Sequence, residues 1–178
     1  HAAAGGVGLI ACQWLAALGV TTIGTVGSDE KAQLAKAHGC HHVINYSREN
    51  FLDRVKEITK GAGVPVVYDS VGKDTFERSV ECLRPFGMMV SFGNASGQVP
   101  PIDFAKALKG SLFLTRPSLM QYTAKREDLV ATAKDLFDIV LSGKVKIEVN
   151  QRYPLREAAQ AHRDLEARKT TGSTILLP

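Results

Sequence analysis

The sequence predicts an α/β fold with a doubly wound parallel sheet. Short runs of β-branched and apolar residues alternate with amphipathic, helix-like segments through most of the 178 residues. Such alternation is typical of parallel strands joined by right-handed helical crossovers. The runs are continuously apolar, as expected for strands that are covered on both faces. The predicted strands are residues 20–26, 42–46, 64–70, 88–92 and 111–115.

Helices are predicted between these strands, because apolar residues recur there on one face and glycines follow them. Ser28 or Asp29, Ser47 and Asp74 are suited to cap three of these helices, since their side chains accept hydrogen bonds from N–H groups at a helix start. The predicted helices are residues 8–18, 30–38, 48–60, 74–83, 104–109 and 126–141.

The last part of the chain does not fit this count. With one strand before the start of the chain, the strands above complete a sheet of order 3-2-1-4-5-6. A strand over 145–149, a helix over 155–168 and a strand over 173–177 remain. They either extend the sheet or pack on another part of the protein, and we expect the second. The chain begins without methionine and without the first strand, so we expect a fragment of a longer protein.

A glycine-rich turn opens the chain. Ala3, Gly5 and Gly8 occupy the small positions of the pattern G-x-G-x-x-G, with alanine in place of the first glycine. Small residues let the backbone approach a pyrophosphate, and the N–H groups and dipole at the start of the next helix attract its charge. The alternative is that the small residues serve only the close packing of a helix on a strand.

Composition and charge exclude several classes of protein. The net charge of +4 is mild and dispersed, which argues against a nucleic-acid partner. The apolar runs are too short to span a membrane, and no signal-peptide pattern opens the chain. The 3 cysteines and 5 histidines show no spacing typical of a disulfide framework or a metal site. We therefore expect no metal and a reducing, cytoplasmic compartment.

The end of the strand over residues 20–26 indicates the cofactor. An acidic residue there would hydrogen-bond the adenosine ribose of NAD, whereas Gly27 and Ser28 leave room for the extra phosphate of NADP. Asp29 and Glu30 argue against a phosphate because they are close in sequence. We expect both to point outward at the helix start, where acidic side chains favour the dipole.

Two further residues favour NADP. Lys31 lies one helical turn after this strand end. Tyr46 ends the next strand, where its ring can stack, or its hydroxyl can hydrogen-bond, near the same phosphate. Each has an ordinary alternative, a solvated helix lysine and a strand-end tyrosine. Taken together they predict NADPH as the cofactor.

The segments 68–72, 91–94 and 115–117 end the later strands, and we expect them to face the nicotinamide end of the cofactor. None of them pairs a nucleophile with a base, so the catalytic residues stay unknown. Hydride transfer does not require such a pair from this domain, because the cofactor carries the chemistry.

Several of these motifs occur in matching order in one family, and the chain resembles NADPH-dependent quinone oxidoreductases. These form the zeta-crystallin-like branch of the medium-chain dehydrogenase/reductase superfamily. The resemblance covers essentially the whole chain. It rests on residues 2–8 (AAAGGVG), 45–46 (NY), 68–72 (YDSVG), 91–94 (SFGN), 116–118 (RPS), 153–155 (YPL) and 161–162 (AH).

The resemblance implies a Rossmann-type NAD(P)-binding domain over residues 1–143, with its first strand largely missing and the family's N-terminal GroES-like catalytic domain absent. It implies that residues 144–178 return to that missing domain. The expected activity is zinc-independent hydride transfer from NADPH to a quinone, in a homodimer. The cofactor-binding residues that it implies are Gly5, Gly6, Val7, Gly8, Gly27, Ser28, Lys31, Tyr46, Ser70, Phe92, Gly93, Asn94 and Arg168.

Two alternative functions stay open. A related reductase would act on an enone or alcohol, since the missing domain holds much of the substrate pocket in this family. An RNA-binding or structural, crystallin-type role is disfavoured, because the scattered charge offers no basic and aromatic platform.

The strand over residues 111–115 indicates how two copies would associate. It is unusually apolar for the edge of a sheet, and an exposed edge of this kind invites pairing with another chain. We expect two copies of this strand to lie side by side in a homodimer.

Overall fold

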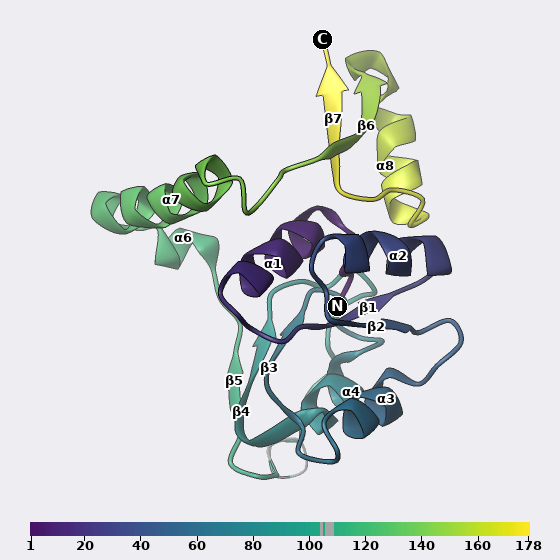
Figure 1. Cartoon of the computed structure of the whole chain (residues 1–178), viewed down its shortest axis with the longest axis vertical. Helices are drawn as coiled ribbons and strands as arrows, with labels where there is room; N and C mark the ends of the chain where they lie inside the picture. The colour runs from purple at the N-terminus through teal and green to yellow at the C-terminus, as the bar shows by residue number, and fades with distance from the viewer. Residues whose placement is uncertain (104, 106–108) are drawn as a thin grey trace. The chain divides into compact units, whose positions relative to one another are not determined.

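The computed structural model describes residues 1–103, 105 and 109–178, so most of the helix predicted over 104–109 lies outside the described residues. The chain divides into two compact units. Unit 1 contains His1 and residues 48–133, and unit 2 contains residues 2–47 and 134–178. Figure 1 gives the element labels that are used below.

The first half of unit 2 has two strands and two helices. These are α1 (Gly6–Ala17), β1 (Ile23–Val26), α2 (Asp29–Ala37) and β2 (His42–Asn45). β1 and β2 pair in parallel, from Ile23 opposite His42 to Val26 opposite Asn45. The backbone N–H of Ala3 donates to the carbonyl of Thr25 at 3.0 Å, which places the glycine turn beside β1.

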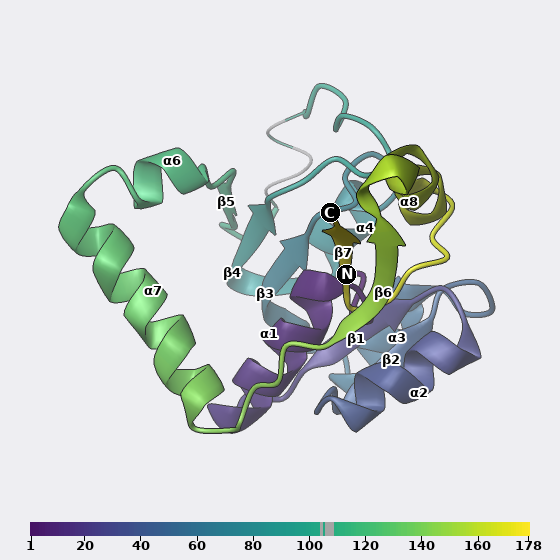
Figure 2. The ribbon, with the colours of Figure 1, turned by 90° about the horizontal axis from the view of Figure 1, so that it is seen from above.

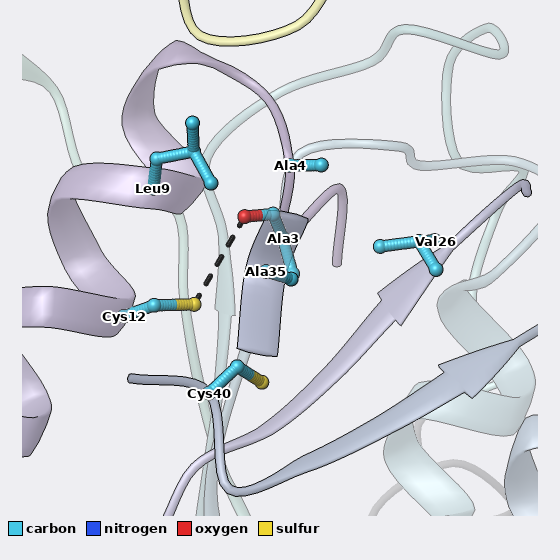
Figure 3. Close-up of a cluster of buried hydrophobic side chains, with 7 residues drawn as sticks. All are labelled: Ala3, Ala4, Leu9, Cys12, Val26, Ala35 and Cys40. Carbon is cyan, nitrogen blue, oxygen red and sulfur yellow. Dashed lines mark hydrogen bonds between the residues drawn. The ribbon is translucent and has the colours of Figure 1, made fainter. Parts of the chain in front are cut away.

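Small side chains make up the core of this half of unit 2. α1 lies close to the turn and to the strands because alanines and cysteines take the place of larger apolar residues there. At Gly24 a methyl group would lie 2.7 Å from both the Ala3 Cβ and the Cys40 Sγ. The buried cluster consists of Ala3, Ala4, Leu9, Cys12, Val26, Ala35 and Cys40 (Figure 3).

The second half of unit 2 is the end of the chain. It holds β6 (Val149–Pro154), a 3-10 turn (Leu155–Glu157), α8 (Ala158–Glu166) and β7 (Ser173–Leu177). β6 and β7 pair in parallel with each other, and among the described residues they form a sheet of their own. The last strands therefore do not extend the other sheets. What else they pack on stays a prediction.

The strand expected over residues 145–149 is wrong, since β6 begins only at Val149. The side chain of Gln13 explains the difference. Its Oε1 accepts from the N–H of Lys146 at 2.8 Å, and its Nε2 donates to the carbonyl of Lys146 at 3.0 Å. Both backbone groups that a ladder would use at Lys146 are therefore bonded to a side chain.

Unit 1 contains a sheet of three parallel strands in the order β3-β4-β5. Figure 2 shows the three strands side by side, and a core of Phe76, Val80 and Met89 lies in the same unit. The strands pair in the order expected for this part of the doubly wound sheet. The elements of unit 1 are α3 (Phe51–Ile58), β3 (Val64–Asp69), α4 (Phe76–Glu81), β4 (Leu83–Ser91), β5 (Phe113–Thr115) and α6 (Leu119–Tyr122). The helix α7 (Arg126–Leu141) begins in unit 1, and its residues from 134 on belong to unit 2.

Two predicted N-caps are wrong. Asn50, not Ser47, caps α3, because its Oδ1 accepts from the N–H of Leu52 at 3.1 Å while the Ser47 hydroxyl donates to the carbonyl of Gly27. α4 has Thr75 rather than Asp74 at its N-cap position. Ser28, by contrast, caps α2 as expected.

Several boundaries also differ from the prediction. β4 begins at Leu83, five residues before the strand predicted over 88–92, and α6 was not predicted. The helix predicted over 126–141 is confirmed as α7. In the described part of the chain, no helix combines the length and apolar character that crossing a membrane requires.

Candidate functional site

The glycine turn of unit 2 leads directly into α1, which begins at Gly6 with Gly5 as its N-cap. Both residues are described, and neither a capping side chain nor an acidic residue of the first turn occupies this helix start. The first N–H groups of a helix have no intrahelical partner, and the dipole is positive there. The start of α1 is therefore suited to an anion such as a phosphate.

The glycines of the turn have different roles. A methyl group on Gly8 would lie 2.2 Å from the carbonyl oxygen of Ala2, which is far inside van der Waals contact. At Gly5 and Gly6 the nearest atoms would be 3.3 and 3.2 Å away, and Val7 is 68% exposed. Close packing thus explains Gly8, whereas it explains Gly5 and Gly6 less well.

The turn also contacts the last part of the chain, and this contact was not predicted from the sequence. Gly172 donates its N–H to the carbonyl of Ala4 at 3.0 Å and forms a parallel bridge with Gly5. The nearest atom to a methyl group on Gly6 would be the carbonyl oxygen of Gly172. The glycine in the sequence Thr-Gly-Ser was the only signal for this contact, and it also fits an ordinary turn.

A second group of predicted residues gathers beyond the end of β1. The Nζ of Lys31 donates to the carbonyl of Arg168, and the Nη1 of Arg168 donates to the Tyr46 hydroxyl at 3.4 Å. A methyl group on Gly27 would lie 2.7 Å from the same hydroxyl oxygen. Residues 27, 31, 46 and 168 therefore meet in one place, which we call the cationic pocket.

The electrostatics of the cationic pocket suit an anion. Burial and then the charge of Arg168 lower the pKa of Lys31 below its ordinary value. Two cations thus lie close together, and a bound anion would stabilise both. Lys31 is accordingly not an ordinary solvated lysine.

The acidic residues near the cationic pocket have other partners. Asp29 accepts from the Nδ2 of Asn45 at 2.8 Å, and Glu30 accepts from the Ser28 hydroxyl at 3.4 Å. Both residues are exposed in the first turn of α2, as expected, and each side chain also has a neighbouring hydrogen-bond partner. Ser28 also accepts from the N–H of Lys31, so its hydroxyl serves as a helix cap.

Arg168 has an unusual backbone conformation. It follows the end of α8 with a φ of 59°, in the left-handed region that favours glycine. Its N–H donates to the carbonyl of Leu165 at 3.0 Å, which closes the last turn of the helix. This conformation lets the Arg168 carbonyl accept from Lys31 while the guanidinium donates to Tyr46.

The other predicted cofactor residues lie together in unit 1. Ser70 follows β3, and Phe92, Gly93 and Asn94 follow β4, the strand paired with β3. A methyl group on Gly93 would lie 2.7 Å from the carbonyl of Ser70. With the amide of Asn94 oriented to satisfy its neighbours, its oxygen accepts from Arg116 at 3.0 Å and its nitrogen donates to the Gly93 carbonyl at 2.9 Å.

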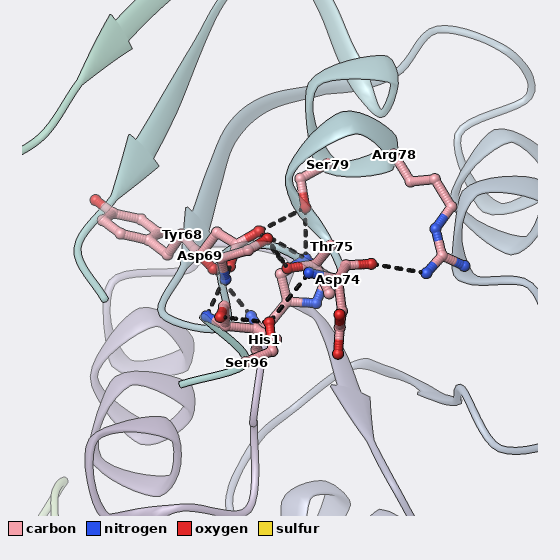
Figure 4. Close-up of polar contacts among 10 residues, drawn as sticks. His1, Tyr68, Asp69, Asp74, Thr75, Arg78, Ser79 and Ser96 are labelled. Atoms are coloured by element: carbon pink, nitrogen blue, oxygen red, sulfur yellow. Dashed lines mark hydrogen bonds and ion pairs between the residues drawn. The ribbon is translucent and has the colours of Figure 1, made fainter. Parts of the chain in front are cut away.

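A buried carboxylate beside these residues was not predicted from the sequence. Asp69 is fully buried and accepts hydrogen bonds from Thr75 and Ser79 (Figure 4). The signal for this arrangement was an aspartate at a strand end, three residues before a glycine. The contacts of Asp69 with α4 could not be predicted from residue spacing.

A metal centre has no support among the described residues, where no group of three His, Cys, Asp or Glu side chains is placed to hold an ion. Cys12, Cys40 and Cys82 are buried free thiols. Burial raises the pKa of Cys82 to about 11.

Parallel strands joined by helices, with a glycine turn at the first helix and a cationic pocket beyond the neighbouring strand, characterise a Rossmann-type nucleotide-binding domain. Comparison with known families agrees with this class. The profile described as "Zinc-binding dehydrogenase" matches residues 6–138. The chain belongs to this family, which is part of the medium-chain dehydrogenase/reductase superfamily.

Relatives in this family are similar over the whole chain. A quinone oxidoreductase of Pseudomonas aeruginosa is 57% identical, and a 2-haloacrylate reductase of a Burkholderia species is 51% identical. The crystal structure of Escherichia coli quinone oxidoreductase complexed with NADPH has a TM-score of 0.96 and 54% identity, and the match covers 100% of this chain and 56% of that one. The chain covers 55% of the length of the Pseudomonas relative and 54% of the Burkholderia one.

Proposed function

We propose that this chain forms the NADPH-binding part of a quinone oxidoreductase. The observation that carries the proposal is the cationic pocket, in which Lys31, Arg168 and the Tyr46 hydroxyl meet beside Gly27. A phosphate on the adenosine ribose is the feature that distinguishes NADPH from NADH, and such cations would recognise it. The similarity to the Escherichia coli enzyme complexed with NADPH supports the same cofactor.

The described residues fit this cofactor by their chemistry. The start of α1, with Gly5 and Gly6, would hold the pyrophosphate through backbone N–H groups. The cationic pocket would hold the ribose phosphate, with Ser28 contributing through the start of α2. When bound, NADPH supplies the hydride, and the domain binds and orients it. The loops with Ser70 and Asn94 would line the nicotinamide end.

The proposal includes an organisation that the family resemblance implies. Residues 1–143 would form the nucleotide-binding domain, and residues 144–178 would return to a substrate domain. The reaction would be zinc-independent. A cytoplasmic location is supported by the three cysteines, because each is a buried free thiol, as is usual in a reducing compartment.

We further propose a homodimer in which β5 pairs with its copy. β5 lies at one edge of its sheet, and its Phe113 and Leu114 are 55% and 40% exposed. Burial of these side chains would remove apolar surface from water, and pairing would satisfy the backbone groups of the edge.

A reductase for activated alkenes is the second candidate function. The 51% identity to a 2-haloacrylate reductase favours it, because such an acceptor also takes up a hydride at an electron-poor double bond. The RNA-binding or structural, crystallin-type role is a weaker alternative, as the net charge of +4 offers little attraction for nucleic acid.

The test uses the full-length gene product that contains this chain. Calorimetry measures its affinity for NADPH and NADH, and NADPH oxidation is followed with 1,4-benzoquinone, an enone and 2-chloroacrylate. Tighter binding of NADPH and turnover with the quinone support the first function, and preferential turnover of the alkenes supports the second. Failure to bind NADPH would contradict both.

A further inference from the structure

The carboxylate of Asp69, the last residue of β3, is surrounded by hydrogen-bond donors in unit 1. Its Oδ1 accepts from the N–H groups of Val71 at 2.8 Å and Gly72 at 3.0 Å. Its Oδ2 accepts from the hydroxyls of Thr75 at 2.7 Å and Ser79 at 2.8 Å (Figure 4). A fully buried carboxylate is tolerated only with such partners, so this arrangement is strongly determined.

A histidine completes the surroundings of the carboxylate. The Nε2 of His1 lies 2.8 Å from the Ser79 hydroxyl oxygen and 3.8 Å from the Oδ2 of Asp69. Ser79 has one proton and donates it to Asp69, so the Nε2 of His1 is the donor in its contact with Ser79. A hydrolytic triad would need the opposite direction and an accessible serine, whereas Ser79 is 0% exposed. The cluster is therefore not a nucleophile with its base.

Asp69 lies at the base of two loops, residues 70–74 and 93–97, which we call the loop pair. The two loops are joined by backbone hydrogen bonds from Ala95 to Ser70, from Ser96 to Val71 and from Lys73 to Gly97, at 2.8–3.2 Å. The Ser96 hydroxyl adds two more, since it donates to the Val71 carbonyl at 2.8 Å and accepts from the N–H of Asp74 at 3.0 Å.

The backbone of the loop pair leaves little freedom. Gly72 has a φ of 89°, and a methyl group there would lie 2.7 Å from the carbonyl of Gly97. Asp69 holds the N–H groups of Val71 and Gly72 from one side, while the loop with Ser96 holds the Val71 carbonyl from the other. The carboxylate thus connects the loop pair to α4 through Thr75 and Ser79.

We propose that Asp69 is a positioning residue for the cofactor. It acts through Val71 and Gly72 on the loop pair, and thereby fixes Gly93 and Asn94, which the proposed function places beside the nicotinamide end. The inference rests on that proposed function, and it adds a residue that would not touch the cofactor. If the loop pair is ordered before the cofactor binds, binding does not carry the entropic cost of ordering it. An ordered loop pair also keeps the reacting atoms aligned.

The variant Asp69→Asn in the full-length gene product tests this role, because it keeps the size of the side chain and removes its charge. We expect faster hydrogen exchange at the amides of residues 71, 72, 96 and 97 without cofactor. With 1,4-benzoquinone we expect kcat to fall on the order of 10- to 100-fold, the size expected for a misplaced reactant. The ratio of NADPH to NADH affinity stays unchanged, since the cationic pocket does not depend on Asp69.

Val80→Ala is the matched control, since Val80 is a buried apolar residue of α4 outside the hydrogen-bond cluster. It lowers the free energy of unfolding while leaving exchange in the loop pair and kcat close to the parent. Equal effects of Val80→Ala and Asp69→Asn on both measurements would overturn the positioning role and leave a purely structural one.

Ser96→Ala is the second variant if Asp69→Asn does not fold. Ser96 is only half-buried and joins the two loops directly. It should produce the same changes in exchange and kcat in weaker form, and unchanged exchange at residues 71 and 72 would overturn the proposal. If the parent does not bind NADPH, the proposed function fails, whereas the exchange measurement still decides whether Asp69 holds the loop pair.

Discussion

The Nη1 of Arg168 donates a hydrogen bond to the hydroxyl of Tyr46 at 3.4 Å, although the two residues are 122 positions apart in sequence. Lys31 joins them by donating to the carbonyl of Arg168. The three residues come from α2, the end of β2 and the end of α8, and they share partners. Substitutions among them are therefore expected to be non-additive, as for any group of side chains in contact.

Lys31→Ala should reduce the preference for NADPH over NADH. Loss of one charge-assisted contact with the ribose phosphate should narrow the difference in binding free energy by about 1–3 kcal/mol. Calorimetric titration of the full-length gene product with each cofactor measures this, and Lys36→Ala on the exposed face of the same helix is the control. Equal affinities of the parent for the two cofactors would show that the pocket is wrongly assigned.

Cofactor binding should be coupled to proton uptake in alkaline solution. The pKa of Lys31 is lowered from 10.5, so between the lowered value and 10.5 part of the free protein carries a neutral lysine. In this window the unfolded chain binds more protons than the folded one, so the contribution of Lys31 makes the free energy of unfolding rise with pH. A bound phosphate restores the charge, which raises the pKa again.

Calorimetry at a pH within this window, in two buffers of different ionisation enthalpy, measures the protons that are taken up. NADPH should show greater uptake than NADH, and Lys31→Ala should abolish the difference. Identical uptake for the two cofactors in the parent would contradict the role of Lys31.

Two glycines of the first turn should respond differently to a methyl group. Gly8→Ala places a carbon 2.2 Å from the carbonyl of Ala2, so the backbone must shift, at a cost of about 1–3 kcal/mol in stability. Gly6→Ala meets its nearest atom at 3.2 Å and should leave the fold intact while weakening NADPH binding. Thermal unfolding by circular dichroism, with cofactor titration, separates the two effects; unfolding of Gly6→Ala would mean that this glycine serves packing.

Substitutions in β5 should convert the proposed dimer to monomers. Phe113→Lys places a charge on the exposed apolar edge, and Leu114→Pro removes a backbone donor. Sedimentation of the parent and both variants measures the change, and Phe137→Lys, an exposed site on α7, controls for loss of apolar surface alone. A monomer mass for the parent at every concentration would rule out the β5 interface.

The thiol of Cys82 should make stability depend on alkaline pH. Burial raises its pKa from 9.0 to about 11 in the folded chain. Between these values the unfolded state loses the proton while the folded state keeps it, so the free energy of unfolding falls as the pH rises. Urea unfolding at intervals across this range measures the slope, and Cys82→Ala should show a smaller one. An unchanged slope in Cys82→Ala would indicate that other groups cause the loss.

The elements most accurately predicted from sequence were those with local signals. α7 has acidic residues in its first turn and Ser-Gly after its end, and its predicted bounds agree with the structure. The cap of α2 at Ser28 was equally local. The start of α3 was missed because Ser47 and Asn50 are both good caps. Ser47 instead bonds to the carbonyl of Gly27, and that contact depends on the fold.

The parts of the candidate site that could be predicted are those that depend on the types of residue next to one another in the sequence. Gly27 and Lys31 could be named because the strand over residues 20–26 is followed by Gly27 and Ser28 and not directly by an acidic residue. Gly172 and the contacts of Asp69 could not be named, since they depend on segments brought together over long stretches of sequence. Gln13 shows the same limit, because its bonds to Lys146 replace a strand that the apolar pattern favoured.

The left-handed backbone of Arg168 lowers the thermal stability of the fold, whereas its side chain is proposed to raise the affinity for NADPH. An arginine in this conformation costs about 1–2 kcal/mol relative to glycine, which adopts it without a Cβ clash. Arg168→Gly should therefore raise the melting temperature while removing a cation from the pocket. A library screened only for survival on heating would be enriched in Arg168→Gly, and one screened for NADPH capture would be depleted of it. In the proposed function, the contact of Arg168 with the ribose phosphate would offset the cost of this backbone conformation.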